Sequence, residues 1–194
     1  MNETLNYYNK NATTFVQGTI SVDFEENQNK FATKLVDGAH ILDFGCGSGR
    51  DTKCFMERGF SVDATDGSVE LCEIASKYTG MQVRCMLFEE LEAIEEYDGI
   101  WACSSILHLP KHQLGPVLIK MLHALKENGI IYTSFKYGEF EGDRNGRYFT
   151  DFTEETFRAF IKELPELKVE ELWTTVDVRI GRGEDRWLNI ILRK

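Results

Sequence analysis

Residues 39–52 read AHILDFGCGSGRDT, and this stretch decides the fold. The mostly apolar segment Ile41–Phe44 has the composition of a buried strand, and it leads into glycines at every second position. Glycine tolerates positive φ angles and has no Cβ, so the backbone there can approach a ligand closely. A polar, helix-competent segment starts at Arg50, and a helix beginning there offers free N–H groups and a partial positive charge. The stretch therefore predicts a nucleotide-type site at the carboxyl edge of a parallel strand.

The same motif separates the classes of nucleotide. A dinucleotide fingerprint, G-x-G-x-x-G/A, needs a small residue at its sixth position. Counted from Gly45 that position is Arg50, and counted from Gly47 it is Thr52, so neither register fits NAD. Asp43 at the strand end would repel a pyrophosphate but suits a ligand that carries an ammonium group. The motif therefore favours S-adenosylmethionine (SAM), which has a zwitterionic tail and no phosphate.

Hydrophobic periodicity predicts alternating strands and helices along the rest of the chain. The predicted helices span residues 23–36, 50–58, 69–79, 114–125 and 153–164. Further strands are predicted at 60–64, 81–86, 97–104, 130–135, 168–173 and 187–192. This alternation demands a parallel sheet with helices on both faces, while the last two strands, with no helix between them, can pair antiparallel. The polar, glycine-containing segment 136–147 is expected to be a mobile loop.

Composition limits the possible partners. The chain has 194 residues, the length of one domain, and a net charge of −10 with 22 basic against 32 acidic residues. A nucleic-acid partner would require a basic stripe, so no DNA partner is expected. No apolar run could span a membrane and no signal peptide begins the chain, so a cytoplasmic location is expected. The five cysteines contain no CxxC pair, which suits reduced thiols and predicts no metal site.

A second acid strengthens the cofactor assignment. Asp66 follows the second predicted strand, 23 residues after Asp43, about the offset at which an acid reaches ribose hydroxyls. With these residues the chain resembles the class I SAM-dependent methyltransferases over essentially its whole length. It is most similar to the small-molecule group that includes the tellurite-resistance and type 11–12 methyltransferases.

The resemblance implies a Rossmann-like α/β fold in a single domain, residues 1–194, with an N-terminal helical cap (1–38) and a core (39–194). The expected sheet is doubly wound and seven-stranded, in the order 3-2-1-4-5-7-6 with strand 7 antiparallel. A monomer or weak homodimer is expected.

The resemblance also implies where SAM binds. Asp43 and the glycines would form the methionine side, Asp66 would hold the ribose diol, and Cys103 with Ser104 would border the transferable methyl group. Many relatives place an Asp after strand 3, where this chain has Met86–Glu90, so Phe88 would stack on adenine and Glu89 or a backbone carbonyl would accept from its amino group. The full predicted set is Tyr7, Tyr8, Asp43, Gly45, Cys46, Gly47, Gly49, Arg50, Asp66, Gly67, Phe88, Glu89, Cys103 and Ser104.

Acceptor-binding residues are expected in the later loops. His108 follows strand 4, where it is either a general base or a structural imidazole. Arginines and a lysine gather in two segments expected over the carboxyl edge, and they favour recognition of a small anion; the alternative is a set of solvated cations paired with neighbouring acids. The residues predicted to carry the reaction are His108, Tyr137, Arg147 and Arg179.

These observations predict an enzyme that transfers a methyl group from SAM to a small, anionic or soft nucleophile. A protein or RNA acceptor, or a non-catalytic SAM-binding role, remains as an alternative. Strand 4 ends in Cys-Ser-Ser-Ile, residues 103–106, rather than in the Asp/Asn-Pro-Pro-aromatic motif that grips a base amino group, which counts against methylation of DNA.

Overall fold

The computed structural model describes residues 3–179 and 181–194. Its α-helices are α1 (Glu3–Gln17), α2 (Glu25–Ala32), α3 (Arg50–Glu57), α4 (Val69–Thr79), α5 (Lys111–Ala124) and α6 (Glu154–Ile161). The strands are β1 (His40–Phe44), β2 (Ser61–Asp66), β3 (Arg84–Cys85), β4 (Tyr97–Ala102), β5 (Leu125–Lys136), β6 (Glu141–Arg144), β7 (Arg147–Thr150), β8 (Lys168–Val176) and β9 (Arg186–Arg193). Two 3₁₀ turns, η1 (Phe88–Glu90) and η2 (Ile106–His108), follow β3 and β4.

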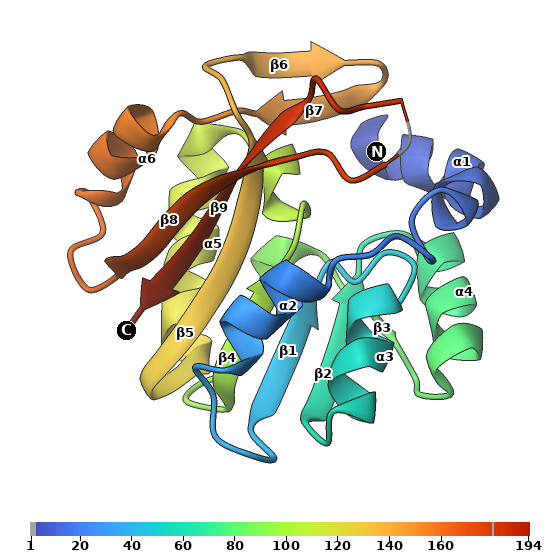
Figure 1. Cartoon of the computed structure of the whole chain (residues 1–194), viewed down its shortest axis with the longest axis horizontal. Helices are drawn as coiled ribbons and strands as arrows, with labels where there is room; N and C mark the ends of the chain where they lie inside the picture. The colour runs from blue at the N-terminus through green and yellow to red at the C-terminus, as the bar shows by residue number, and fades with distance from the viewer. Residues whose placement is uncertain (1–2, 180) are drawn as a thin grey trace.

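Seven strands form one twisted sheet in the order β3-β2-β1-β4-β5-β9-β8 (Figure 1). The pairs from β3 to β5 are parallel, and β9 runs antiparallel to both β5 and β8. When the separate hairpin β6–β7 is left out of the numbering, this is the order 3-2-1-4-5-7-6 with strand 7 antiparallel. The predicted fold class is confirmed.

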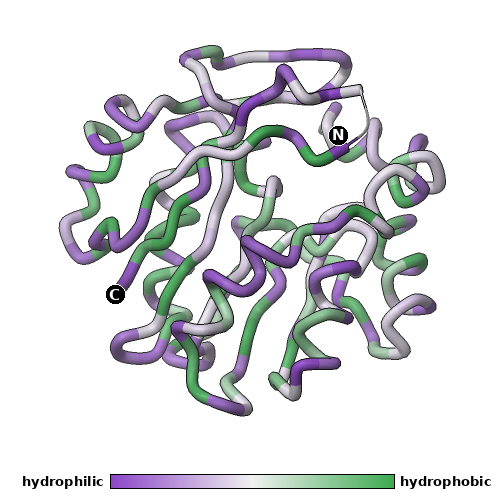
Figure 2. The backbone as a smooth tube through the Cα atoms, in the orientation of Figure 1, coloured by the Kyte–Doolittle hydropathy of each residue, from purple (hydrophilic) through white to green (hydrophobic). Residues whose placement is uncertain are grey.

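Side chains that alternate along the central strands fill both faces of the sheet. Leu42 and Phe44 of β1 join a core cluster with residues of α5 and α6, whereas Ile41 joins a cluster with residues of α2 and α3. Trp101 of β4 lies in the second cluster and stacks on Tyr132 of β5 with ring centroids 3.9 Å apart. Hydrophobic residues accordingly gather along the strands (Figure 2). Helices therefore cover both faces, and only the strand ends remain for a site.

The segment expected to be a mobile loop is instead largely a β-hairpin, and that prediction was wrong. Strands β6 and β7 pair with four residues each. They are joined by Asn145 and Gly146, whose φ angles are 53° and 75°. An Asn-Gly pair favours the tight hairpin turn with positive φ at both residues. This dipeptide indicated the hairpin, although the polar composition of the segment suggested a loop. Figure 1 shows the hairpin above the carboxyl ends of the parallel strands, with α1 beside it.

Several predicted boundaries shift at the edges of the fold. The helix expected over 23–36 covers only Glu25–Ala32, and the strand expected over 81–86 is reduced to Arg84–Cys85. Residues 1–22 show little hydrophobic periodicity, yet α1 forms there because Ala12 and Val16 pack against Leu71 of α4. Tertiary contact rather than local pattern holds this helix in place.

Candidate active site

A cavity of about 1040 Å³ opens at the carboxyl edge of the parallel strands. It lies where β1 and β4 are neighbours although the chain leaves them in opposite directions, the topological switch point at which open α/β sheets bind ligands. Its walls come from α1, the glycine loop after β1, the ends of β2, β4 and β5, the hairpin β6–β7 and the connection between β8 and β9. Of the residues predicted from the sequence, Tyr7 and Gly49 do not line it.

The three glycines of the loop serve two different purposes. Their φ angles are all positive, at 89° for Gly45, 55° for Gly47 and 78° for Gly49. A Cβ on Gly45 would lie 2.4 Å from the Cβ of Ser105, and one on Gly47 would lie 3.1 Å from the ring of Phe15. A Cβ on Gly49 would instead meet α4, 2.9 Å from a Thr79 methyl group. The first two glycines therefore shape the cavity floor, whereas the third allows α3 to pack against α4.

A buried carboxyl group, Asp43, lies beneath the loop. It is 2% exposed and accepts a 2.5 Å hydrogen bond from Thr52 Oγ1. The neighbouring charge of Arg50 is already committed to Asp51, to which Arg50 donates two hydrogen bonds of 2.7 and 2.8 Å. Burial and then the negative charge of Asp51 raise the pKa of Asp43 to about 8. A cationic group placed beside Asp43 would therefore stabilise its ionised form and displace its proton.

This shift makes cofactor affinity depend on pH. If the ammonium group of the cofactor binds beside Asp43, affinity for S-adenosylhomocysteine (SAH) should rise as the pH increases from 6 to 8 and level off above 8. The expected slope approaches about tenfold per pH unit well below the pKa, because one proton must leave on binding. Calorimetric titrations in two buffers of different ionisation enthalpy measure both affinity and proton release. Asp43→Asn should flatten the profile, and a flat profile in the wild-type protein would contradict the assignment.

Asp66 at the end of β2 links the strand to the glycine loop. Its carboxylate accepts backbone hydrogen bonds from Gly47 and Ser68, each 2.9 Å long. Burial raises the pKa of Asp66, although the backbone N–H groups oppose that shift. Each carboxylate oxygen has two acceptor positions, so capacity remains for hydroxyl groups of a ligand. Asp66 therefore anchors the loop and can still receive a diol.

Two further predicted residues line the cavity beyond β3. Phe88 lies in η1, partly buried, with its ring 4.9 Å from that of Phe44 in an edge-on contact. Glu89 is exposed and belongs to the same wall. An aromatic side chain followed by a carboxylate can contact the face and the amino edge of a purine.

At the end of β4 the backbone takes an unusual conformation. Ser104 has a φ angle of 52°, and its N–H donates to Ser134 Oγ at 2.9 Å. Burial raises the pKa of Cys103 to about 12, so its thiol stays protonated. Backbone held in the left-handed region by a residue other than glycine tends to occur at functional sites. Ser134 was missed by sequence reasoning, although its position two residues before Lys136 on β5 places both on one face of that strand.

His108 joins α1 to the hairpin. Its Nδ1 lies 2.6 Å from the carbonyl oxygen of Tyr148, and its Nε2 lies 2.8 Å from the hydroxyl of Tyr8. Because a carbonyl oxygen only accepts, Nδ1 carries the hydrogen and Nε2 accepts from Tyr8. Burial is the main cause that lowers the pKa of His108 to about 4. Both ring nitrogens are thus occupied by the protein, and the role of His108 as a base stays a prediction. Tyr7 stacks edge-on against Tyr8 instead of facing the cavity.

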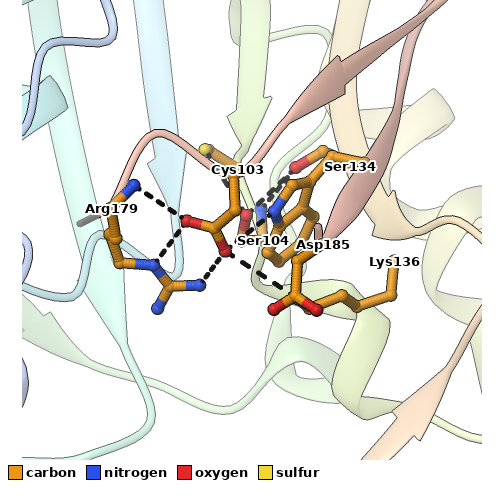
Figure 3. A network of polar contacts seen from close by, with 8 residues as sticks. Cys103, Ser104, Ser134, Lys136, Arg179 and Asp185 are labelled. Atoms are coloured by element: carbon orange, nitrogen blue, oxygen red, sulfur yellow. Dashed lines mark hydrogen bonds and ion pairs between the residues drawn. The ribbon is translucent and has the colours of Figure 1, made fainter. Parts of the chain in front are cut away.

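Three of the cations in the two segments predicted to bind an acceptor are paired with acids. Arg179 donates to both carboxylate oxygens of Asp177, and Lys136 lies 2.8 Å from Asp185 and 3.8 Å from Asp177 (Figure 3). Burial alone would raise the pKa of Asp177, but the hydrogen bonds from Arg179 lower it to about 2. Arg144 is held by Asp151 at 2.7 Å. These three cations are therefore paired with acids of the chain, which is the alternative to binding an acceptor.

Arg147 is different. Its guanidinium lies 4.5 Å above the ring of Tyr7 and 5.1 Å from that of Phe149. Within the described part of the chain it forms no ion pair, and its buried Nε has no hydrogen-bond partner. Tyr137 is 37% exposed and is covered by the guanidinium of Arg186 at 4.8 Å. Arg182 and Arg186 also line the cavity but are exposed to solvent, so Arg147 is the partly buried cation of this set whose charge remains available to a ligand.

Two absences bear on the kind of site. Among residues 3–179 and 181–194, no helix is long and apolar enough to cross a membrane. The same residues contain no group of three or more histidine, cysteine, aspartate or glutamate side chains that could hold a metal ion.

Comparisons with known proteins agree with this geometry. Residues 41–129 match the methyltransferase domain model. An uncharacterized methyltransferase of Staphylococcus carnosus is 23% identical over 181 residues, which cover 89% of this chain and 86% of that protein. The malonyl-[acyl-carrier protein] O-methyltransferase of Acetivibrio thermocellus is 26% identical over 117 residues, 54% of this chain and 41% of that protein.

Among solved structures, the 1,6-didemethyltoxoflavin-N1-methyltransferase of Burkholderia thailandensis, which holds SAH, superposes with a TM-score of 0.77. Its identity to this chain is 20%, with coverage of 98% of this chain and 84% of that one. This likeness supports the fold, and the matched domain contains the glycine loop, Asp43 and Asp66. The matched methyltransferase domain, the methyltransferase relatives and the shared fold together support a SAM-dependent methyltransferase.

Proposed function

We propose that this methyltransferase acts on a small acceptor whose anionic group is bound by Arg147. The observation that carries the proposal is the unpaired, aromatic-stacked guanidinium on the cavity wall. An arginine with its faces packed on rings offers its N–H edges in a fixed plane, which matches the two oxygens of a carboxylate or phosphate. In a chain of net charge −10, a partly buried cation without an ion pair on the cavity wall favours an anion.

The cofactor half of the cavity is assigned from the same geometry. Asp43 would face the ammonium group, the backbone at Gly45 and Gly47 would lie along the methionine chain, and Asp66 would accept from the ribose hydroxyls. Phe88 and Glu89 would contact adenine. Bound SAM supplies an electrophilic methyl group, and the residues of this chain hold the cofactor and the acceptor in place.

Methyl transfer from a sulfonium ion needs the nucleophile in line and close to the methyl carbon. Holding two reactants in such a geometry can contribute up to ~7–11 kcal/mol. Cys103 and Ser104 at the end of β4 line the same cavity as His108, which supports a position of the reacting atoms between the cofactor half and Arg147. An anionic or soft nucleophile can react without losing a proton first, which fits an imidazole whose two nitrogens are already occupied.

The alternative of a protein or RNA acceptor is less well supported. Segments of α1 and of the hairpin both contribute cavity walls, which leaves less room for a macromolecule than an open sheet edge would. The net negative charge also disfavours RNA.

A labelled-methyl screen tests the proposal. The protein is incubated with methyl-labelled SAM and a metabolite extract, separated by size, and products are identified by mass spectrometry. The expected product is a low-mass compound that carries a carboxylate or another anionic group before or after transfer. Label found only in protein or RNA fractions, or only in products whose unmethylated precursors carry no anionic group, would contradict the proposal.

A further inference from the structure

Strand β7 and the residue that follows it direct a row of three side chains to the cavity. Arg147, Phe149 and Asp151 line it, whereas the residues between them point elsewhere. The Tyr148 hydroxyl donates to Glu141 at 3.2 Å, and Thr150 Oγ1 donates to the carbonyl of Leu109 at 2.7 Å. Side chains alternate along a strand, so the odd-numbered positions share one face. The cavity wall therefore presents a cation, an aromatic ring and a carboxylate in sequence.

The two ends of this row each contain an unsatisfied polar atom. Arg147 Nε and Asp151 Oδ1 are both buried and have no hydrogen-bond partner. Asp151 is 4% exposed, and its other carboxylate oxygen accepts from Arg144 at 2.7 Å. Buried polar atoms are almost always hydrogen-bonded, and each exception calls for an explanation. The side chains of both residues line the cavity, so a small rotation of either would let a ligand there supply the missing partner.

We propose that the acceptor is amphoteric, with an anionic group for Arg147, an N–H or O–H donor for Asp151 and an apolar or aromatic body against Phe149. This inference rests on the proposed function and extends it by a second polar contact. The donor need not be a cation, because Arg144 already balances the charge of Asp151.

The dimensions of the strand suit a compact acceptor. At about 3.3 Å per residue, the Cα atoms of Arg147 and Asp151 lie about 13 Å apart. Both side chains line the cavity, and a molecule of one ring with polar groups at opposite ends is of a size that suits this spacing. The ring of Phe149 lies 4.8 Å from His108 and 5.1 Å from the Arg147 guanidinium. The guanidinium of Arg144, which donates to Asp151, also lies 5.2 Å from that ring.

Burial raises the pKa of Asp151, and the contact with Arg144 opposes that shift. A carboxylate in this setting gains from any additional hydrogen bond to its ionised form. The N–H or O–H group of the bound methyl acceptor would donate that hydrogen bond to Oδ1, because Arg144 donates to the other carboxylate oxygen.

Three matched probes test the inference on the SAH-loaded full-length protein. They are 4-aminophenylacetate, phenylacetate, which lacks the donor, and the methyl ester of 4-aminophenylacetate, which lacks the anion. Calorimetry should show 4-aminophenylacetate binding at least tenfold more tightly than either of the others. Equal affinities for all three, or no binding of 4-aminophenylacetate at millimolar concentration, would overturn the inference.

Asp151→Asn separates recognition from folding. Arg144 would hold the amide oxygen, so an amide N–H₂ would stand in place of Oδ1 and oppose a donor. The variant should bind 4-aminophenylacetate no better than phenylacetate, with unchanged affinity for phenylacetate and SAH. Asp143→Asn, on the same hairpin and exposed, is the matched control and should resemble the wild type.

The outcomes also separate this inference from the proposed function. If Asp151→Asn leaves the preference for 4-aminophenylacetate intact, the proposed contact with Asp151 is wrong. The proposed function would still stand if phenylacetate binding depends on Arg147. If phenylacetate binding does not depend on Arg147, the proposed function itself fails.

Discussion

Replacing Arg147 by methionine is expected to lower kcat/KM for the acceptor by about 100- to 1000-fold, while affinity for SAH stays within about twofold. Removing one partner of a buried, charge-assisted pair typically costs 2–5 kcal/mol, and 1.4 kcal/mol corresponds to a factor of ten. Methionine keeps an extended side chain between Tyr7 and Phe149, so the packing changes less than the charge. Steady-state kinetics with the acceptor from the labelled screen measure the loss, and calorimetry with SAH measures the cofactor side.

Two comparisons make this result specific to Arg147. Arg179→Ala should cost less than about tenfold, because Asp177 already occupies that guanidinium. Arg158→Ala, at an exposed position of α6, removes the same charge from the far surface and should have no effect. If kcat/KM of Arg147→Met stays within threefold of the wild type, Arg147 does not bind the anionic group of the acceptor, and the proposed contact is ruled out.

The second large effect is expected at the end of β2. Asp66→Ala should weaken SAM and SAH binding by at least about 100-fold, because two losses combine. The ribose hydroxyls lose a charged acceptor, worth roughly 1.5–3 kcal/mol, and the N–H groups of Gly47 and Ser68 lose the carboxylate that holds the loop. Calorimetric titration with both ligands gives the affinities directly.

Asp66→Asn should fall between alanine and the wild type, since the amide keeps one acceptor oxygen. Glu70→Ala removes an exposed acid from the first turn of α4 and should bind SAM normally, which controls for the change of net charge. Circular dichroism should show that Asp66→Ala remains folded. A folded variant with unchanged affinity would mean that the ribose is held elsewhere.

The sequence could gather most residues of the candidate cofactor half, which line one cavity in the structure, because they are close together in sequence. Asp43, the glycines and the start of α3 lie within ten residues, and Asp66 follows at the offset that one helix and one strand require. The sheet order follows from the alternation of elements once the family resemblance is recognised. Trp101 stacks on Tyr132 in the core, as a continuous apolar strand indicates.

The acceptor half could not be read in the same way. Lys136, Arg144, Arg147 and Arg179 all have acids nearby in sequence, and only the fold shows which of them are paired. The ion pairs Arg144–Asp151 and Lys136–Asp185 span 7 and 49 residues, so no local pattern distinguishes them from Arg147. Asp151 itself was overlooked, because the hairpin that directs it inward was taken for an irregular loop.

Helix α1 touches both halves of the cavity at once. Phe15 lies over Gly47, and Asn9 accepts from Ser68 at 2.6 Å. Farther along, Tyr8 donates to His108, and Thr4 accepts from the backbone of Tyr148 at 3.0 Å. A helix that contacts both ligand sites can couple the binding of the two ligands. Such coupling is reciprocal, so each ligand changes the affinity for the other by the same factor. We therefore expect bound SAH to raise the affinity for the acceptor, and the acceptor to raise the affinity for SAH to the same extent.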